Sequence, residues 1–111
     1  NVNSRIKLIS ELCSCKVDIS SRYEPWDYNP DSYMRKLTAE LMRDFYGHEM
    51  NEEVCPGGLE CCNFLPQMPG LDIVMYAPIG GACHTTEEYM NLDSFDRVYE
   101  FTKLLLKSLD K

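Results

Sequence analysis

The chain has 111 residues, of which 44% are hydrophobic and 26% are charged, and its formal net charge is -7. A chain of this length and apolar content can form one folded domain at most. The acidic balance disfavours binding to nucleic acid and to anionic membrane surfaces, because both attract a surplus of lysine and arginine. No apolar run reaches the roughly 18–20 residues of a membrane span and no secretory signal pattern is visible, so we expect a cytoplasmic protein.

The cysteines are expected to be free thiols rather than disulfides. Disulfides belong to a secretory context, which the sequence does not indicate, and free cysteine behaves as a small hydrophobic residue that is often buried. The six cysteines are Cys13, Cys15, Cys55, Cys61, Cys62 and Cys83.

The first segment predicts a helix followed by a strand. Val2, Ile6 and Ile9 recur at helical spacing within residues 1–12, which is typical of an amphipathic helix. Residues 15–23 then alternate, with Val17 and Ile19 on one face, as in a half-buried strand. A single strand has no partner of its own, so its edge invites pairing with another chain.

A second helix is predicted after the loop at residues 24–30. Asn29 is a suitable N-cap, Pro30 fits the first helical position, and Gly47 is a typical C-terminal stop. Its apolar stripe is predicted to be Met34, Leu37, Leu41 and Phe45, with Thr38 and Met42 beside it.

The second half predicts two strands and two further helices. Residues 52–55 favour a short strand, 59–64 a short helix, and 71–77 a strand buried on both faces because the run is almost entirely apolar. Residues 78–92 are predicted to be a loop. The last helix is expected to start near Asp93 or Ser94, with one apolar face made of Phe95, Val98, Tyr99, Thr102, Leu105, Leu106 and Leu109.

The order of these elements predicts an α/β fold. Helices that alternate with strands are expected to cover a sheet in three layers. Only two or three strands are predicted here, whereas a mean sheet has about five or six. The sequence therefore predicts part of a three-layer domain rather than a complete one.

His84 is the first candidate for chemistry. It follows a predicted buried strand, next to Gly80-Gly81 and before Glu87-Glu88, and in open α/β sheets ligands gather beyond the carboxyl ends of strands. A neutral imidazole in this position can bind zinc; the alternative is an ordinary hydrogen bond within the loop. The two glutamates either orient the imidazole or solvate the loop.

Gly57-Gly58 with Glu60 form the second candidate. Backbone amides in a glycine turn that opens a helix can cradle a carboxylate, although the two glycines taken alone are better explained by a plain turn.

A zinc site built from Cys61, Cys62 and Cys83 with His84 has suitable chemistry. Its spacing is unfavourable, because adjacent side chains rarely point at one tetrahedral ion and no C-x-x-C motif is present.

Three motifs, in order, resemble the C-terminal part of the aminoacyl-histidine (Xaa-His) dipeptidases of the co-catalytic zinc peptidase clan. They are Tyr23-Glu24-Pro25-Trp26 with Asn29-Pro30-Asp31-Ser32, then Pro56-Gly57-Gly58-Leu59-Glu60-Cys61, then His84-Thr85-Thr86-Glu87-Glu88. In the family, the second motif has histidine where this chain has Pro56.

This resemblance implies two parts. Residues 1–23 would be the last helix and strand of a lid (dimerisation) domain, and residues 24–111 the C-terminal part of the three-layer catalytic domain. His84 would be a metal ligand, and Gly57, Gly58 and Glu60 would bind substrate. The family uses two divalent ions, usually zinc, to polarise a dipeptide carbonyl and activate water, and it forms homodimers through the lid.

The resemblance also implies that the isolated chain is inactive. The family's other metal ligands and its general-base glutamate lie upstream of the matched region, and one imidazole cannot hold two catalytic ions. We therefore expect no catalytic residue and no stably bound metal in this chain, although the longer parent would be a metallo-dipeptidase. The alternative is a non-enzymatic binding or assembly domain that keeps only the fold.

Overall fold

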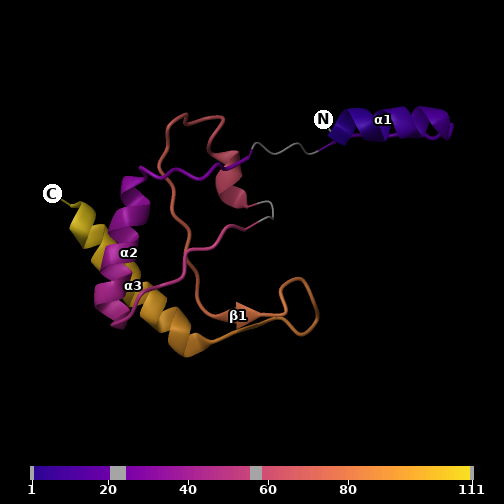
Figure 1. Ribbon diagram of the computed structural model, residues 1–111. Helices are drawn as coiled ribbons and strands as arrows, with labels where there is room; N and C mark the ends of the chain where they lie inside the picture. The colour runs from indigo at the N-terminus through magenta and orange to yellow at the C-terminus, as the bar shows by residue number, and fades with distance from the viewer. Residues whose placement is uncertain (1, 21–24, 56–58, 111) are drawn as a thin grey trace.

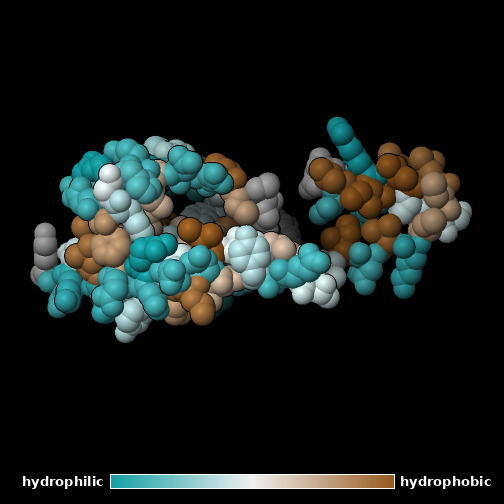
Figure 2. All heavy atoms as spheres, turned by 90° about the horizontal axis from the view of Figure 1, so that it is seen from below, coloured by the Kyte–Doolittle hydropathy of each residue, from teal (hydrophilic) through white to brown (hydrophobic). Residues whose placement is uncertain are grey.

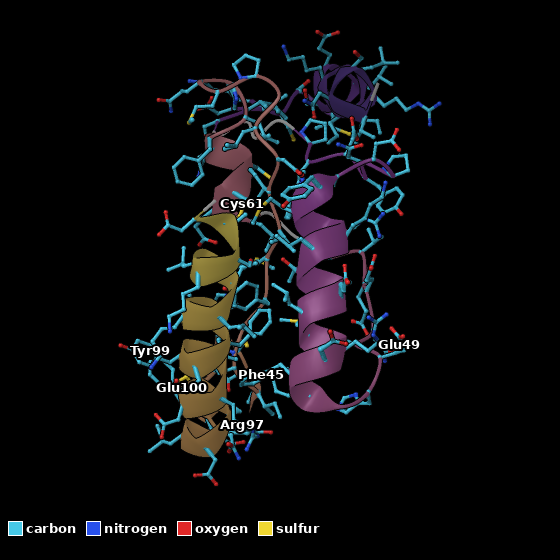
Figure 3. All side chains as sticks on the ribbon, turned by 90° about the vertical axis from the view of Figure 1, so that its left-hand side faces the viewer. Phe45, Glu49, Cys61, Arg97, Tyr99 and Glu100 are labelled. Atoms are coloured by element: carbon cyan, nitrogen blue, oxygen red, sulfur yellow. The ribbon has the colours of Figure 1, made fainter. Side chains whose placement is uncertain are left out.

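The computed structural model describes residues 2–20, 25–55 and 59–110. Its elements are α1 (Val2–Leu12), α2 (Tyr33–Tyr46), the 3-10 helix η1 (Glu60–Asn63), β1 (Gly80–Gly81), β2 (Tyr89–Met90) and α3 (Leu92–Leu109). Helices α2 and α3 pack side by side, and the connecting segments run along one side of the pair (Figures 1 and 3). We call residues 25–55 and 59–110 the body, and residues 2–20, which lie apart from it, the arm.

The arm contains the first predicted helix, which is confirmed as α1. Ser14 has a positive φ of 51°, so the chain reverses after α1. Ile6, Ile9 and Val17 then line an apolar hollow of about 300 Å³ between the helix and the returning segment. The strand predicted at 15–23 is wrong over its described part, because residues 15–20 form no strand, and residues 21–23 lie outside the described residues.

The start of α2 differs from the prediction by three residues. Ser32 is the N-cap, and its hydroxyl accepts a hydrogen bond from the Arg35 amide at 3.0 Å. Asn29 instead closes a local turn by accepting from the Asp31 amide at 2.9 Å. The predicted stop is confirmed, because Gly47 adopts the left-handed conformation and its amide donates to the Arg43 carbonyl at 2.9 Å.

A distant carboxylate explains this start. One oxygen of Asp72 accepts from the Ser32 hydroxyl at 2.5 Å, and the other accepts from the Met34 amide at 2.8 Å. The Met34 amide first, and then the Ser32 hydroxyl, hold the pKa of Asp72 below its ordinary value. Asp72 thus satisfies an amide that the end of a helix would leave unpaired.

We expect Asp72→Ala to lower the free energy of unfolding at pH 7 by about 1–2 kcal/mol, because a charged cap of the helix is lost. Since the pKa of Asp72 is lowered on folding, its stabilisation is present above the unfolded value of about 4 and disappears as the pH falls through the folded value. Urea unfolding followed by helical circular dichroism at pH 7 and at acidic pH measures both effects. Asp31→Ala is the matched control, because its carboxylate is exposed and, within the described part of the chain, pairs only with Lys36, at 3.6 Å.

The core is a small cluster between α2 and α3. Met42, Phe101 and Leu105 are its buried apolar members, and Phe101 has no exposed surface. The Phe101 ring lies 5.2 Å from the Tyr76 ring, edge to face, and the Tyr76 hydroxyl lies 3.0 Å from the Thr102 hydroxyl. The core therefore joins both helices to the segment before β1.

The predicted faces of both helices are rotated from the observed ones. In α2 the buried residues are Thr38 and Met42, which the prediction placed beside the stripe, and Phe45 is partly exposed. In α3 they are Ser94, Phe101 and Leu105, of which the predicted face included only the last. Each helix has more apolar surface than one neighbour covers, so the contact between them selects the buried face.

The strands predicted at 52–55 and 71–77 are wrong. Both segments are described and neither forms a strand. A strand exists only where a neighbour completes its backbone hydrogen bonds, and neither segment has such a neighbour among the described residues. The short helix predicted at 59–64 is confirmed as η1. The described residues therefore contain one sheet, of two short strands, and not the layered sheet that the sequence predicts.

The molecule exposes more surface than a closed domain of its size. Its radius of gyration is 19.1 Å, against about 13 Å for a compact domain of this length. Its accessible surface is 9471 Å², against about 6300 Å² for a folded monomer of this mass. Hydrophobic side chains gather over the arm (Figure 2), and the exposed ones of α1 are Val2, Ile6, Leu8, Ile9 and Leu12.

Candidate functional site

His84 lies at the tip of a hairpin within the predicted loop 78–92. Strand β1 pairs antiparallel with β2, with Gly80 opposite Met90 and Gly81 opposite Tyr89. The approach is close: a Cβ on Gly80 would lie 2.9 Å from the Tyr89 carbonyl oxygen, and one on Gly81 would meet the Tyr89 ring at 2.7 Å. The two glycines are therefore the sequence signal for this hairpin, and the prediction of a plain loop missed it.

The hairpin is bonded to the start of α3. The Asn91 amide donates to the Ile79 carbonyl at 2.8 Å, and the Ile79 amide donates to the Ser94 hydroxyl at 2.8 Å. Ser94 is buried, and its own amide donates to the Asn91 side chain, the N-cap of α3, at 2.8 Å. The helix start therefore fixes both ends of the hairpin that presents His84.

The turn around His84 is held by local hydrogen bonds. The His84 amide donates to the Glu88 carboxylate at 3.2 Å, and the Thr85 hydroxyl donates to the Ala82 carbonyl at 2.7 Å. His84 has a φ of 64°, a left-handed conformation that costs an L-residue roughly 1 kcal/mol or more. Glu88 thus stabilises the backbone of the turn rather than orienting the imidazole.

The residues present do not by themselves fit a two-ion centre. The His84 imidazole is exposed, and no three potential ligand side chains among the described residues come together around an ion. Two co-catalytic ions need several carboxylate or imidazole ligands between them. His84 is therefore a lone candidate among the described residues, on a hairpin anchored to α3.

The structure does not bring the two candidate sites together. Gly57 and Gly58 lie outside the described residues. Glu60 is exposed in the first turn of η1, and Figure 1 places η1 and the hairpin at separate ends of the body. The zinc alternative fails for the same reason, since Cys61 and Cys62 belong to η1 whereas Cys83 and His84 belong to the hairpin.

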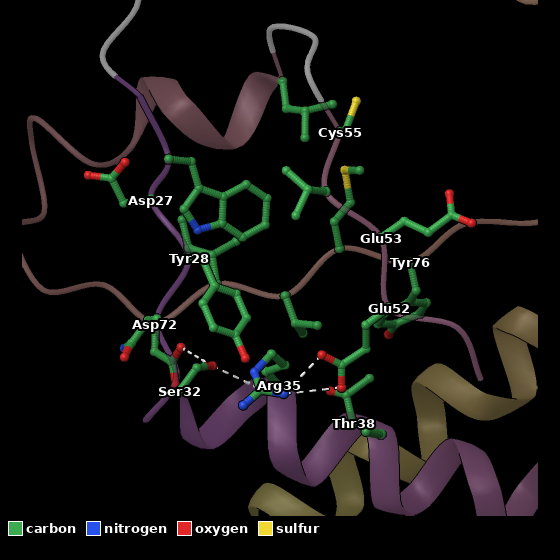
Figure 4. Close-up of a pocket in the computed structure, with 18 of the residues that line it drawn as sticks. Asp27, Tyr28, Ser32, Arg35, Thr38, Glu52, Glu53, Cys55, Asp72 and Tyr76 are labelled. Carbon is green, nitrogen blue, oxygen red and sulfur yellow. Dashed lines mark hydrogen bonds and ion pairs between the residues drawn. The ribbon is translucent and has the colours of Figure 1, made fainter. Parts of the chain in front are cut away.

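A cavity of about 1400 Å³ in the body was not predicted. It is lined by residues along the length of α2, from Arg35 to Tyr46, and by residues 25–29, 51–55 and 70–77. Both oxygens of Glu52 accept from the Arg35 guanidinium, at 3.1 and 2.9 Å, and the Tyr28 ring lies under the same group (Figure 4). The Arg35 Nε and Thr38 Oγ1 atoms are buried and have no hydrogen-bond partner among the described residues. A charge pair and two unsatisfied polar atoms therefore border an open apolar space.

Comparison with known proteins gives the family. A model described as peptidase family M20/M25/M40 matches residues 2–108, almost the whole chain. The chain belongs to this family. The match covers α1 and the body together, so both are parts of an M20-type sequence.

One relative is the cytosol non-specific dipeptidase of Escherichia coli (strain K12). It is 23% identical over 108 residues, which cover 97% of this chain but only 22% of that protein. The chain therefore spans about a fifth of the length of the relative it matches. No solved structure matches. In the described part of this family member, no helix has the length and apolar character to cross a membrane.

Proposed function

We propose that this chain is the C-terminal part of a zinc-dependent M20 dipeptidase. The observation that supports the proposal is the placement of His84: the family match covers the whole hairpin, and the start of α3 fixes the loop that exposes this imidazole. Residues 1–23 would belong to the lid and residues 24–111 to a three-layer catalytic domain. The remaining layers and metal ligands would come from the longer parent.

In that parent, His84 would be one ligand of a two-ion centre. Gly57, Gly58 and Glu60 would bind the substrate. The substrate class is a dipeptide. The resemblance of the motifs favours Xaa-His peptides, whereas the relative's name describes a non-specific dipeptidase. Pro56 occupies the position where the Xaa-His motif has histidine, which favours the broader specificity. We also propose that the parent protein is cytoplasmic and forms a homodimer.

The isolated chain is expected to hydrolyse no dipeptide, because by the family resemblance only one of its two histidines, His84, would bind a metal and the general base would lie in the longer parent. Alanyl-histidine and alanyl-alanine with added zinc or manganese, followed by amino-acid release, form the assay. Turnover that His84→Ala abolishes would contradict this expectation.

The role of His84 is tested in a chimera. The matching 22% of the Escherichia coli dipeptidase is replaced by this chain, and the folded chimera is assayed with and without His84→Ala. We expect loss of hydrolysis by at least about 100-fold, since removal of a metal ligand disrupts the catalytic ion. His48→Ala is the control, because His48 is the only other histidine and lies in an exposed loop. Equal activity of the two variants would refute the assigned ligand.

The second candidate function is a non-enzymatic assembly domain. The excess of exposed surface, 9471 Å² against about 6300 Å², fits this candidate as well as the first, because either a partner chain or the rest of the longer parent would cover it. A reading frame that contains no upstream ligand segments would favour this candidate over the enzyme.

A further inference from the structure

Helix α1 ends in a turn that has a cysteine on either side. The Cys15 amide donates to the Ser10 carbonyl at 2.8 Å, and the Ser14 amide donates to the Glu11 carbonyl at 3.2 Å. These two bonds form a Schellman motif, in which the residue after the helix is left-handed and is usually glycine. Ser14 occupies that position, with a φ of 51°. The motif therefore fixes the backbone between Cys13 and Cys15.

This turn brings the two cysteines to the separation that a disulfide requires. A left-handed residue is the mirror image of a helical one, so by helix geometry the Cα atoms on either side of Ser14 lie about 5.4 Å apart. The Cα atoms of disulfide-bonded cysteines are most often about 5.5–6 Å apart. In an extended strand the same two atoms would lie about 6.6–6.8 Å apart, at the upper limit for such a bond. The reversal of the chain therefore favours a bond between these cysteines.

Both cysteines are free and exposed, and both border the apolar hollow beside α1. The Cys15 thiol donates to the Cys13 carbonyl oxygen at 3.5 Å, so its sulfur atom turns back toward residue 13. Cys62, by contrast, is buried, as expected of a cysteine that packs as a small hydrophobic residue. Burial therefore accounts for Cys62 but not for the pair at the end of α1.

We propose that Cys13 and Cys15 are a reversible dithiol site that reacts with small-molecule disulfides. The thiolate of one cysteine attacks a sulfur of the small disulfide and forms a mixed disulfide, and the released thiolate takes up a proton. The thiolate of the other cysteine then attacks the protein sulfur of that bond, and the second small thiol leaves with a proton. Two protein thiols are oxidised to one disulfide, and one small disulfide is reduced to two thiols.

The disulfide at this site is expected to be easily reduced again. Exposed disulfides have higher reduction potentials than structural ones, and bonds of this kind are the regulatory or catalytic ones. The bond would join the end of α1 to the first residue of the returning segment. None of the residues proposed to bind metal or substrate takes part, so this inference does not rest on the proposed dipeptidase function.

The test equilibrates the full chain in mixtures of reduced and oxidised glutathione, blocks the remaining thiols by alkylation and digests the chain with trypsin. Cleavage after Lys7 and Lys16 releases residues 8–16, which contain Cys13 and Cys15, while the other four cysteines fall within residues 44–97. Mass spectrometry of peptide 8–16 distinguishes two blocked thiols, one internal disulfide and glutathione adducts. The oxidised fraction at each ratio gives the equilibrium constant for disulfide formation.

We expect this constant to be at least about tenfold larger in the native chain than in the same chain unfolded in urea, because unfolding frees the backbone of Ser14. Ser14→Pro should lose most of this advantage, since proline holds φ near about −65° and has no amide to donate to Glu11. Ser14→Gly is the matched control, because glycine adopts the left-handed conformation readily, and its constant should stay within about threefold of the native value.

Any of three results would rule the site out: equal constants in the native and the unfolded chain, equal constants for the two variants, or glutathione adducts without an internal disulfide at every ratio. Residue 14 lies outside the core of Met42, Phe101 and Leu105, so both variants are expected to fold, and circular dichroism checks this. The comparison of native with unfolded chain needs no variant, so it decides the proposal even where Ser14→Pro does not fold.

Discussion

Phe101→Ala is expected to lower the free energy of unfolding by about 3–5 kcal/mol, the usual cost of truncating a buried aromatic ring. The Phe101 side chain is fully buried and lies near the rings of Phe45, Tyr46 and Tyr76. A small domain has a total stability of about the same size. The variant should therefore lose the packing of α2 on α3 at room temperature.

Urea unfolding followed by helical circular dichroism measures this loss, and Phe95→Ala is the matched control. Phe95 belongs to the same helix but is 47% exposed, so its truncation should cost less than about 1 kcal/mol. Equal destabilisation by the two variants would show that α3 buries its other face, and the observed core would then be wrong.

Gly80→Ala is expected to open the hairpin that carries His84. The new Cβ would lie 2.9 Å from the Tyr89 carbonyl oxygen, and backbone in a paired strand cannot move aside without breaking its ladder. Overpacking of this kind costs about 1–3 kcal/mol. The Asn91 amide, which donates to the Ile79 carbonyl, should then exchange with solvent at least about tenfold faster by NMR.

Gly81→Ala is the control for this prediction. Its Cβ would meet only the far end of the Tyr89 ring, and that side chain is 62% exposed and can turn into solvent. Exchange at Asn91 should change less than in Gly80→Ala. The reverse order would mean that the ring, and not the backbone, sets the spacing of the hairpin.

Helix positions were predictable because their signals are local. The spacing of Val2, Ile6 and Ile9 predicted α1, and Gly47 ended α2 as expected. The start of α2 was not predictable, because Asp72, forty residues from Ser32, completes the cap. The sequence around the helix start predicted Asn29 as the N-cap, because such a prediction considers neighbouring residues and not a carboxylate forty residues away.

Strands and buried faces depend on neighbours, and the sequence could not supply them. Residues 71–77 have the composition of a buried strand, but a strand needs a ladder partner, and the described residues offer none. Phe101 was missed because α3 is apolar on more than one side. For the site, spacing singled out His84 and Gly80-Gly81, while the hydrogen bonds that join the hairpin to Ser94 appear only in the structure.

The left-handed backbone of His84 has a consequence for how the gene changes over time. At a φ of 64°, glycine or asparagine would be conformationally easier than histidine. If selection acts only on folding and not on the imidazole, position 84 should therefore come to hold glycine or asparagine more often than histidine. Retention of histidine among natural alleles, at a site where the backbone favours its replacement, would be the mark of a side chain still in use.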